Sequence, residues 1–317
     1  MIAYRLLVVM LIIVSVFLCA ERNVNSAQSD ENQTEQVARL NIKASFITTM
    51  ISDGDGGVFV GTEDYGVYHY DSNGNSKQFT RKDGLGDDNA YALAIDKLGR
   101  LWIGHLNSGV SVFNGERWKN YDVVDGPIGE RVFDIQTCPI DGDVRIATSA
   151  GITRYKLNAD EWEHFTREDG LLEDQASSLA FKKDGTLIVG TQCHGIAVFN
   201  RNGGNYKHSK NITAPERFGV NNCSPVPLIP ESDGLPTNQI NQIIVASDNK
   251  IWIATPTGLV RSDSSLKTLY YVRGKDYADK VCGLYGGAPK DWKEYLLPED
   301  YITWAPLITC FNFDSLL

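Results

Sequence analysis

The sequence has no second long hydrophobic run. Its one apolar stretch, residues 6–18, follows Arg5 and is followed by the small residue Ala20. A run of this length is too short to cross a bilayer stably, and its polarity is typical of a secretory signal peptide. We therefore predict a cleaved signal over residues 1–20, a polar linker over residues 21–45, and an exported protein that lies in the periplasm or outside the cell.

Cysteine is scarce, with six residues in the chain. Cys19 lies in the predicted signal, and the preceding Val16-Phe17-Leu18 lacks the small residue expected before a lipidated cysteine, so we expect no lipoprotein anchor. The cysteines that remain after removal of the signal are odd in number. This excludes a complete disulfide framework.

Basic residues are outnumbered by acidic ones, 30 against 40, which gives a net charge of −10. Nucleic-acid phosphates would be repelled, so nucleic acid is excluded as a partner. The five histidines have no zinc-ligand spacing, and no compact Asp-rich calcium loop or strong catalytic motif is present. The sequence therefore predicts no metal, no cofactor and no enzyme.

What the sequence does contain is a repeat of about 43 residues. A short apolar run with a small central residue recurs at Gly61, Gly104, Ala147, Gly190 and Ala254. Two further markers keep the same phase: single glycines at 66, 109, 151, 195 and 258, and Asp-Gly pairs at 83–84, 125–126, 169–170 and 233–234. Periods of about 40–50 residues are typical of propellers and solenoids.

Each unit contains four short apolar runs separated by turn residues, which predicts four strands and no helix. In the second unit these are residues 91–96, 101–105, 110–113 and 118–121. The second strand is apolar on both faces, as a sheet between two neighbouring sheets requires, and the small residue after it lets the sheets approach closely. We predict an all-β fold, a β-propeller of four-stranded antiparallel blades, with five complete blades plus a partial or irregular sixth.

The residues from Asp233 to Ile240, followed by Ile251-Trp252-Ile253-Ala254-Thr255 and Gly258-Leu259-Val260-Arg261, resemble the two-component regulator propeller repeat. The likeness covers about residues 46–271. The resemblance implies an extracytoplasmic propeller, commonly the sensor part of a membrane-bound histidine kinase that often responds to glycan fragments. Nothing after residue 271 resembles a kinase.

Two segments depart from the regular repeat. Residues 207–232 contain four prolines and no alternation, which predicts a long inserted loop in blade four. Residues 272–317 are predicted to form an irregular tail or an incomplete next blade, because Leu297-Pro298 resembles the start of a unit that is not continued. Either the ring closes irregularly or the chain is a truncated product of a longer gene, and we favour truncation.

In an up-and-down blade, the strand two-to-three loops share one face with the blade-to-blade connections, and variable loops on a constant scaffold usually carry function. We predict a ligand in the central funnel of this face, bound by Tyr65, His105, Asn107, Arg131, Gln175, His194 and Asn238. In this interpretation Tyr65 and the two histidines stack on a sugar ring and Arg131 pairs with a carboxylate. Cys193 and Cys223 both fall near this face, as a disulfide or as two separate thiols.

The sequence thus predicts an exported, non-catalytic ligand-binding or sensory propeller. Its expected partners are an oligosaccharide or other small ligand and, through the resemblance, a membrane-bound histidine kinase. Two alternatives remain open. One is a polysaccharide lyase or glycoside hydrolase that uses carboxylates on the same face, and the other is a protein-interaction scaffold. The carboxylates in question are Asp87, Asp88, Glu130, Glu173 and Asp174.

Overall fold

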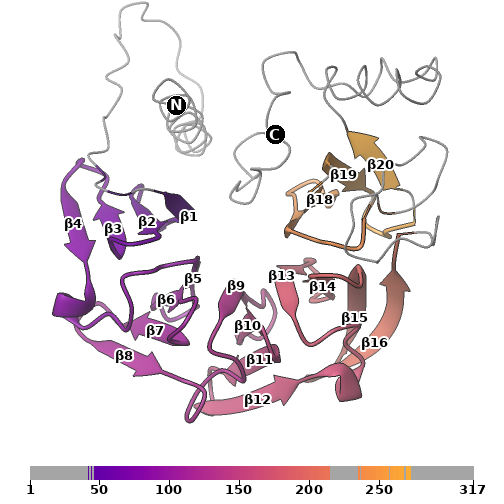
Figure 1. Ribbon diagram of the computed structural model, residues 1–317, viewed down its shortest axis with the longest axis horizontal. Helices are drawn as coiled ribbons and strands as arrows, with labels where there is room; N and C mark the ends of the chain where they lie inside the picture. The colour runs from indigo at the N-terminus through magenta and orange to yellow at the C-terminus, as the bar shows by residue number, and fades with distance from the viewer. Residues whose placement is uncertain are drawn as a thin grey trace, which may run out of the picture.

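The computed structural model describes residues 46–214, 237–256, 258–267 and 269–272, together with residues 42, 44 and 235. These residues form five separate four-stranded antiparallel sheets. The sheets lie side by side around an axis as blades, with the first strand of each blade innermost (Figure 1). The predicted all-β propeller with five blades is therefore confirmed. The predicted signal, nearly all of the predicted linker and tail, and any sixth blade lie outside the described residues.

The strands follow one another in chain order through the blades. Blade 1 comprises β1 (Ile47–Ser52), β2 (Val58–Thr62), β3 (Val67–Tyr70) and β4 (Ser76–Phe79). Blade 2 comprises β5 (Ala92–Ile95), β6 (Leu101–Gly104), β7 (Val110–Phe113) and β8 (Trp118–Tyr121). Blade 3 comprises β9 (Val132–Thr137), β10 (Val144–Thr148), β11 (Gly151–Lys156) and β12 (Glu161–Phe165). Blade 4 comprises β13 (Ala176–Phe181), β14 (Leu187–Thr191), β15 (Ile196–Asn202) and β16 (Asn205–Ile212), and blade 5 comprises β17 (Gln242–Val245), β18 (Ile251–Thr255), β19 (Gly258–Ser262) and β20 (Leu269–Val272).

The outermost strand of blade 4 is longer than expected. β16 runs to Ile212, so residues 207–212, which we assigned to the inserted loop, belong to the strand. The strand continues because Tyr206 and Ile212 still pack on buried clusters while neighbouring side chains point to solvent. The rest of the predicted insertion, apart from residues 213 and 214, lies outside the described residues.

The expectation that no helix is present was wrong in the blade-to-blade connections. Two short 3-10 helices occur there, η2 (Arg81–Asp83) and η3 (Arg167–Asp169). Each begins with a reciprocal capping box between a threonine and an aspartate and ends at a glycine with positive φ. The Asp-Gly pairs at 83–84 and 169–170 are therefore the ends of capped turns. Within the described part of the chain, no helix has the length and apolarity needed to cross a bilayer.

Second strands form the core of the ring. β6, β10, β14 and β18 are buried along their whole length, as predicted from their apolar faces. The small residue near their ends is required by the neighbouring blade. A Cβ atom on Gly104 would lie 2.4 Å from Cγ1 of Val132, and one on Gly190 would lie 2.5 Å from Cγ2 of Ile240. These glycines let successive blades pack in direct contact.

The inner strands are also joined by hydrogen bonds between blades. Thr137 Oγ1 donates to the carbonyl of Ile95 over 3.1 Å, and Ser177 Oγ donates to the carbonyl of Ile240 over 2.6 Å. Thr48 Oγ1 makes the same kind of bond to the carbonyl of Ala90. Such bonds satisfy polar groups on strand edges that would otherwise lack a partner. They also fix the spacing of the strands around the axis.

Candidate functional site: the mouth of the axial channel

The five inner strands, β1, β5, β9, β13 and β17, line a cavity of about 630 Å³. The blades form an arc, and the labelled inner strands β1, β5, β9 and β13 lie on its inner side (Figure 1). This volume is in the range of small-molecule sites, which is about 300–1,000 Å³. We call the side with the strand two-to-three loops and blade-to-blade connections the connection face, and the opposite side the hairpin face. Inner strands begin at the connection face, so their first residues lie at that mouth of the channel.

Three inner strands carry an irregularity close to their first residue. β1, β9 and β13 each skip one residue in the pairing with the second strand, at Thr48, Phe133 and Ser177. A bulge of this kind turns the extra residue out of the ladder and re-aims its side chain. Tyr91 and Asn241 occupy the corresponding positions before β5 and β17, since their N–H groups donate to Gly104 and Ala254. All five residues line the cavity, and we call them the mouth ring.

The mouth ring has an aromatic side and a polar side. Tyr91 and Phe133 meet edge to face with their ring centroids 6.4 Å apart, and Phe46, just before β1, also lines the cavity and is 61% exposed. On the other side are Ser177 and Asn241, joined by Gln192 from the two-to-three loop of blade 4. The mouth therefore offers aromatic rings to one part of a ligand and amide and hydroxyl groups to another.

One carboxylate lies in the channel wall. Asp134 accepts hydrogen bonds from Leu179 N (2.7 Å), Ser178 Oγ (3.1 Å) and Gln136 Nε2 (3.1 Å). Burial raises the pKa of Asp134 above its ordinary value, although these donors act in the opposite direction. Two of the donors belong to the next blade, so the first role of Asp134 is to hold β9 against β13.

Two of the residues predicted from the sequence are buried inside the loops. His105 is fully buried, with Nδ1 donating to the carbonyl of Asn89 over 2.6 Å and Nε2 lying 2.8 Å from Ser111 Oγ. Burial lowers the pKa of His105. Asn238 is also buried, and its Oδ1 accepts from the N–H of Ala214 over 2.6 Å. Both side chains hold the connections in place and are not accessible, so their contact with a ligand stays a prediction that this structure does not support.

The other five predicted residues lie on the connection face but outside the cavity lining. Tyr65, Asn107 and Arg131 are exposed, while Gln175 and His194 are half-buried. The Nδ1 of His194 lies 3.1 Å from Glu173 Oε2. The structure does not bring these residues together around the channel, and their contact with a ligand stays a prediction.

The cysteine of blade 4 is oxidised, whereas that of blade 3 is not. Cys193 is disulfide-bonded, and its N–H donates to Glu173 Oε2 over 2.8 Å. Cys223 lies outside the described residues, so the pairing of these two cysteines stays a prediction. Cys138 is a free, buried thiol.

The carboxylates considered for hydrolysis act as structural acceptors. Four of the five accept hydrogen bonds from backbone N–H groups in the connections: Asp87 from Asn89, Asp88 from Arg81, Glu173 from Cys193 and Asp174 from Arg167. Glu130 is exposed. Capping a backbone N–H satisfies a turn and does not by itself create a catalytic pair.

The mouth ring was missed although a signal for it is present in the sequence. Its members stand at 48, 91, 133, 177 and 241, in phase with the repeat. Aligning the starts of the units, in place of their loops, would have found them. The signal is hard to recognise because the five residues differ from one another. Polar and aromatic residues also occur at ordinary strand starts.

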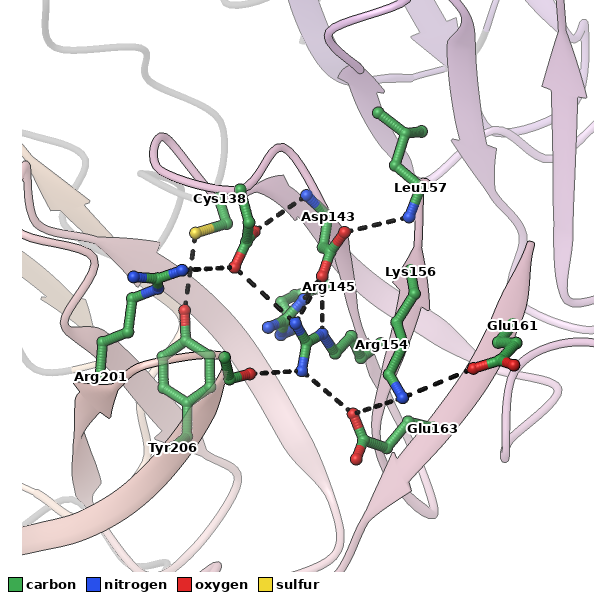
Figure 2. A network of polar contacts seen from close by, with 12 residues as sticks. Cys138, Asp143, Arg145, Arg154, Lys156, Leu157, Glu161, Glu163, Arg201 and Tyr206 are labelled. Atoms are coloured by element: carbon green, nitrogen blue, oxygen red, sulfur yellow. Dashed lines mark hydrogen bonds and ion pairs between the residues drawn. The ribbon is translucent and has the colours of Figure 1, made fainter. Parts of the chain in front are cut away.

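A second polar cluster lies between blades 3 and 4, among the hairpins of the opposite face (Figure 2). Arg154 donates to Asp143 Oδ2 from Nε over 2.7 Å and to the carbonyl of Gly204 from Nη1 over 2.7 Å. Arg145 is fully buried, and its guanidinium carbon lies 5.0 Å from the centre of the Tyr206 ring. These contacts join two blades, and none of the residues lines the channel. We therefore treat the cluster as a structural junction.

The model of the two component regulator propeller family matches residues 84–107 and 234–257. No curated protein matches the sequence. One similar solved structure is the extracellular domain of a protein described as a hybrid two component system from Bacteroides thetaiotaomicron, with a TM-score of 0.57 and 20% identity over 73% of this chain and 28% of that one. Another is the extracellular domain of a protein described as a one component system from the same organism, with a TM-score of 0.50 and 16% identity over 74% of this chain and 36% of that one.

A third similar structure is an auxiliary nutrient binding protein from Bacteroides ovatus, with a TM-score of 0.51 and 13% identity over 72% of this chain and 57% of that one. This chain spans less than two thirds of the length of each of the three structures. At these identities the likeness concerns the fold. Together with the family match, it identifies the five-bladed chain as one that carries two-component regulator propeller repeats.

Proposed function

We propose that this chain is an exported, non-catalytic sensory propeller that binds a small ligand, an oligosaccharide in the first instance, at the connection-face mouth of its channel. The observation that carries the proposal is the mouth ring, in which one residue from each blade lines a cavity of about 630 Å³. Aromatic rings beside amide and hydroxyl groups are typical of small-molecule sites. The repeat type supports a sensory role.

We further propose that the propeller works with a membrane-bound histidine kinase. Extracellular domains of proteins described as hybrid two component and one component systems share its fold, which supports this partner. In this arrangement the propeller recognises the ligand and the kinase carries the signal onward.

A hydrolytic or lyase activity is not favoured by the contacts around the channel. Among the described lining residues, Asp134 is the single carboxylate, and three donors already occupy it. General acid–base catalysis on a glycosidic bond ordinarily uses two carboxyl groups about 5–10 Å apart. The carboxylates of the connection face cap backbone groups in their own loops.

The test is a thermal-shift and calorimetric screen of the full chain against oligosaccharides. Phe133→Ala should reduce the thermal shift, because it deletes half of the aromatic pair at the mouth. Leu98→Ala is the matched control, since Leu98 is 67% exposed on the hairpin face. Equal loss in both variants would contradict a site at the mouth. Co-purification with a membrane protein without any small-molecule shift would favour the scaffold alternative.

A further inference from the structure

We infer that the channel mouth selects an uncharged ligand with one flat apolar face and a polar edge, and that it disfavours acidic ligands. This inference rests on the proposed function and specifies the chemistry of that same site. Neutral sugar rings and nucleosides both have this character, and the calorimetric experiment below distinguishes them.

The flat apolar face is matched by blades 1 to 3. Phe46, Tyr91 and Phe133 line the cavity consecutively around the axis, and the last two form an edge-to-face pair. Tyr91 is 36% exposed although it belongs to an inner strand position. Aromatic surface left open to a cavity gains free energy when a ring-shaped group covers it.

The polar edge is matched by blades 4 and 5 without any charge. Ser177 donates its hydroxyl proton to the carbonyl of Ile240, so its oxygen can only accept from a ligand. Asn241 and Gln192 add amide groups, each with a donor and an acceptor end. This set recognises hydroxyl, amide or ring-nitrogen edges equally well.

The charge of the wall argues against an acidic ligand. Among the described lining residues there is no lysine, arginine or histidine, and the one ionisable carboxyl group is Asp134. An anion that entered would lose hydration with no cation to replace it. A cation gains little either, because Asp134 already accepts from Leu179, Ser178 and Gln136.

The competing interpretation depends on Arg131. This residue is exposed on the connection face, two positions before Phe133, and it was the expected partner of a uronic acid. It does not line the cavity. Removing its charge should therefore leave binding almost unchanged in our interpretation and abolish binding of an acidic ligand in the competing one.

Calorimetry on the full chain with three kinds of probe distinguishes them: cellobiose and maltose as neutral sugars, digalacturonate as an acidic sugar, and adenosine and thymidine as nucleosides. We expect binding of a neutral probe and at least about tenfold weaker binding of digalacturonate. Arg131→Gln should leave neutral binding within about twofold, while Phe133→Ala should weaken it about tenfold, in line with the loss of an aromatic contact. Phe133→Leu, which keeps apolar volume, should be intermediate.

Three results would contradict part or all of the proposal. Preferred binding of digalacturonate that is lost in Arg131→Gln would overturn the charge preference and leave the ligand-binding function standing. Binding of no probe in any arm would overturn both. A neutral probe that binds equally well to Phe133→Ala, with the variant folded by circular dichroism, would overturn the aromatic match and place the ligand elsewhere.

Discussion

Trp102 of blade 2 and Arg145 of blade 3 occupy the same position in the second strand, and both are fully buried. At this position Trp102 has a partner for both its N–H group and its ring. Its Nε1 donates to Asp96 Oδ2 over 2.8 Å, and its ring lies 5.0 Å from the ring of Tyr155 in the next blade. An aromatic side chain at this position supplies large apolar contact together with one polar bond.

Arg145 makes the equivalent contact through its planar, charged guanidinium group. It stacks over Tyr206 of the next blade, but Nη1 lies 4.0 Å from Asp143 Oδ2, and neither Nη atom has a hydrogen-bond partner among the described residues. Burial lowers the pKa of Arg145. The comparison teaches that this position accepts a buried arginine in place of a tryptophan when the guanidinium stacks on an aromatic ring and acids lie nearby (Figure 2).

The largest expected effect comes from truncating Trp102, the member of the pair whose polar atom has a hydrogen-bond partner. Trp102→Ala should lower the free energy of unfolding by about 3–5 kcal/mol, because it leaves a cavity against Tyr155 and removes a buried hydrogen bond to Asp96. Urea denaturation followed by intrinsic fluorescence measures this. Val124→Ala, at a residue that is 88% exposed, should change it by less than about 0.5 kcal/mol. A similar loss in both variants would contradict the core role of Trp102.

Removing the acid beside Arg145 should have the next largest effect. Asp143→Asn should lower the free energy of unfolding by about 3 kcal/mol, because two buried arginines then lose their nearest compensating charge. Chemical denaturation at pH 7 tests this. An exposed pair gives the control: Asp248→Asn, which breaks the contact with Lys250, should cost less than about 1 kcal/mol.

Replacing Arg145 itself should cost far less. Arg145→Met keeps length and flexibility while removing a buried charge whose two Nη atoms have no hydrogen-bond partner among the described residues, so the free energy of unfolding should change by no more than about 1 kcal/mol and can rise. The same denaturation experiment compares it directly with Asp143→Asn. A loss as large as that of Asp143→Asn would show that the charge of Arg145 stabilises the junction.

A parallel comparison concerns His105, which stands where blades 1, 3 and 4 have Thr62, Thr148 and Thr191. Because burial lowers the pKa of His105, the unfolded chain binds a proton more readily than the folded one. The stability contribution is therefore complete above about pH 6.5 and is lost as the pH falls below that value. His105→Thr should flatten this slope, by about 1 kcal/mol or less between pH 7 and pH 5. Melting temperatures of both proteins across that range provide the measurement.

The sequence specified the five blades because their signals are local. Apolar runs, Asn-Gly turns and a glycine such as Gly104 each act within one unit, and repetition reinforces them. The channel site is different, because it depends on bulges at Thr48, Phe133 and Ser177 that appear only when strands pair. The burial of His105 is equally non-local, since it depends on hydrogen-bond partners from two other segments.

The mouth ring has a consequence for how such a protein diversifies. Each of its members is contributed by a different repeat, and three of them sit on residues that the strand pairing skips. Substitution at these positions leaves the hydrogen-bond register of the sheets unaltered. Duplication or exchange of a whole unit would therefore rewrite one fifth of the described recognition surface at a time, so that a lineage can sample new specificities as combinations of modules.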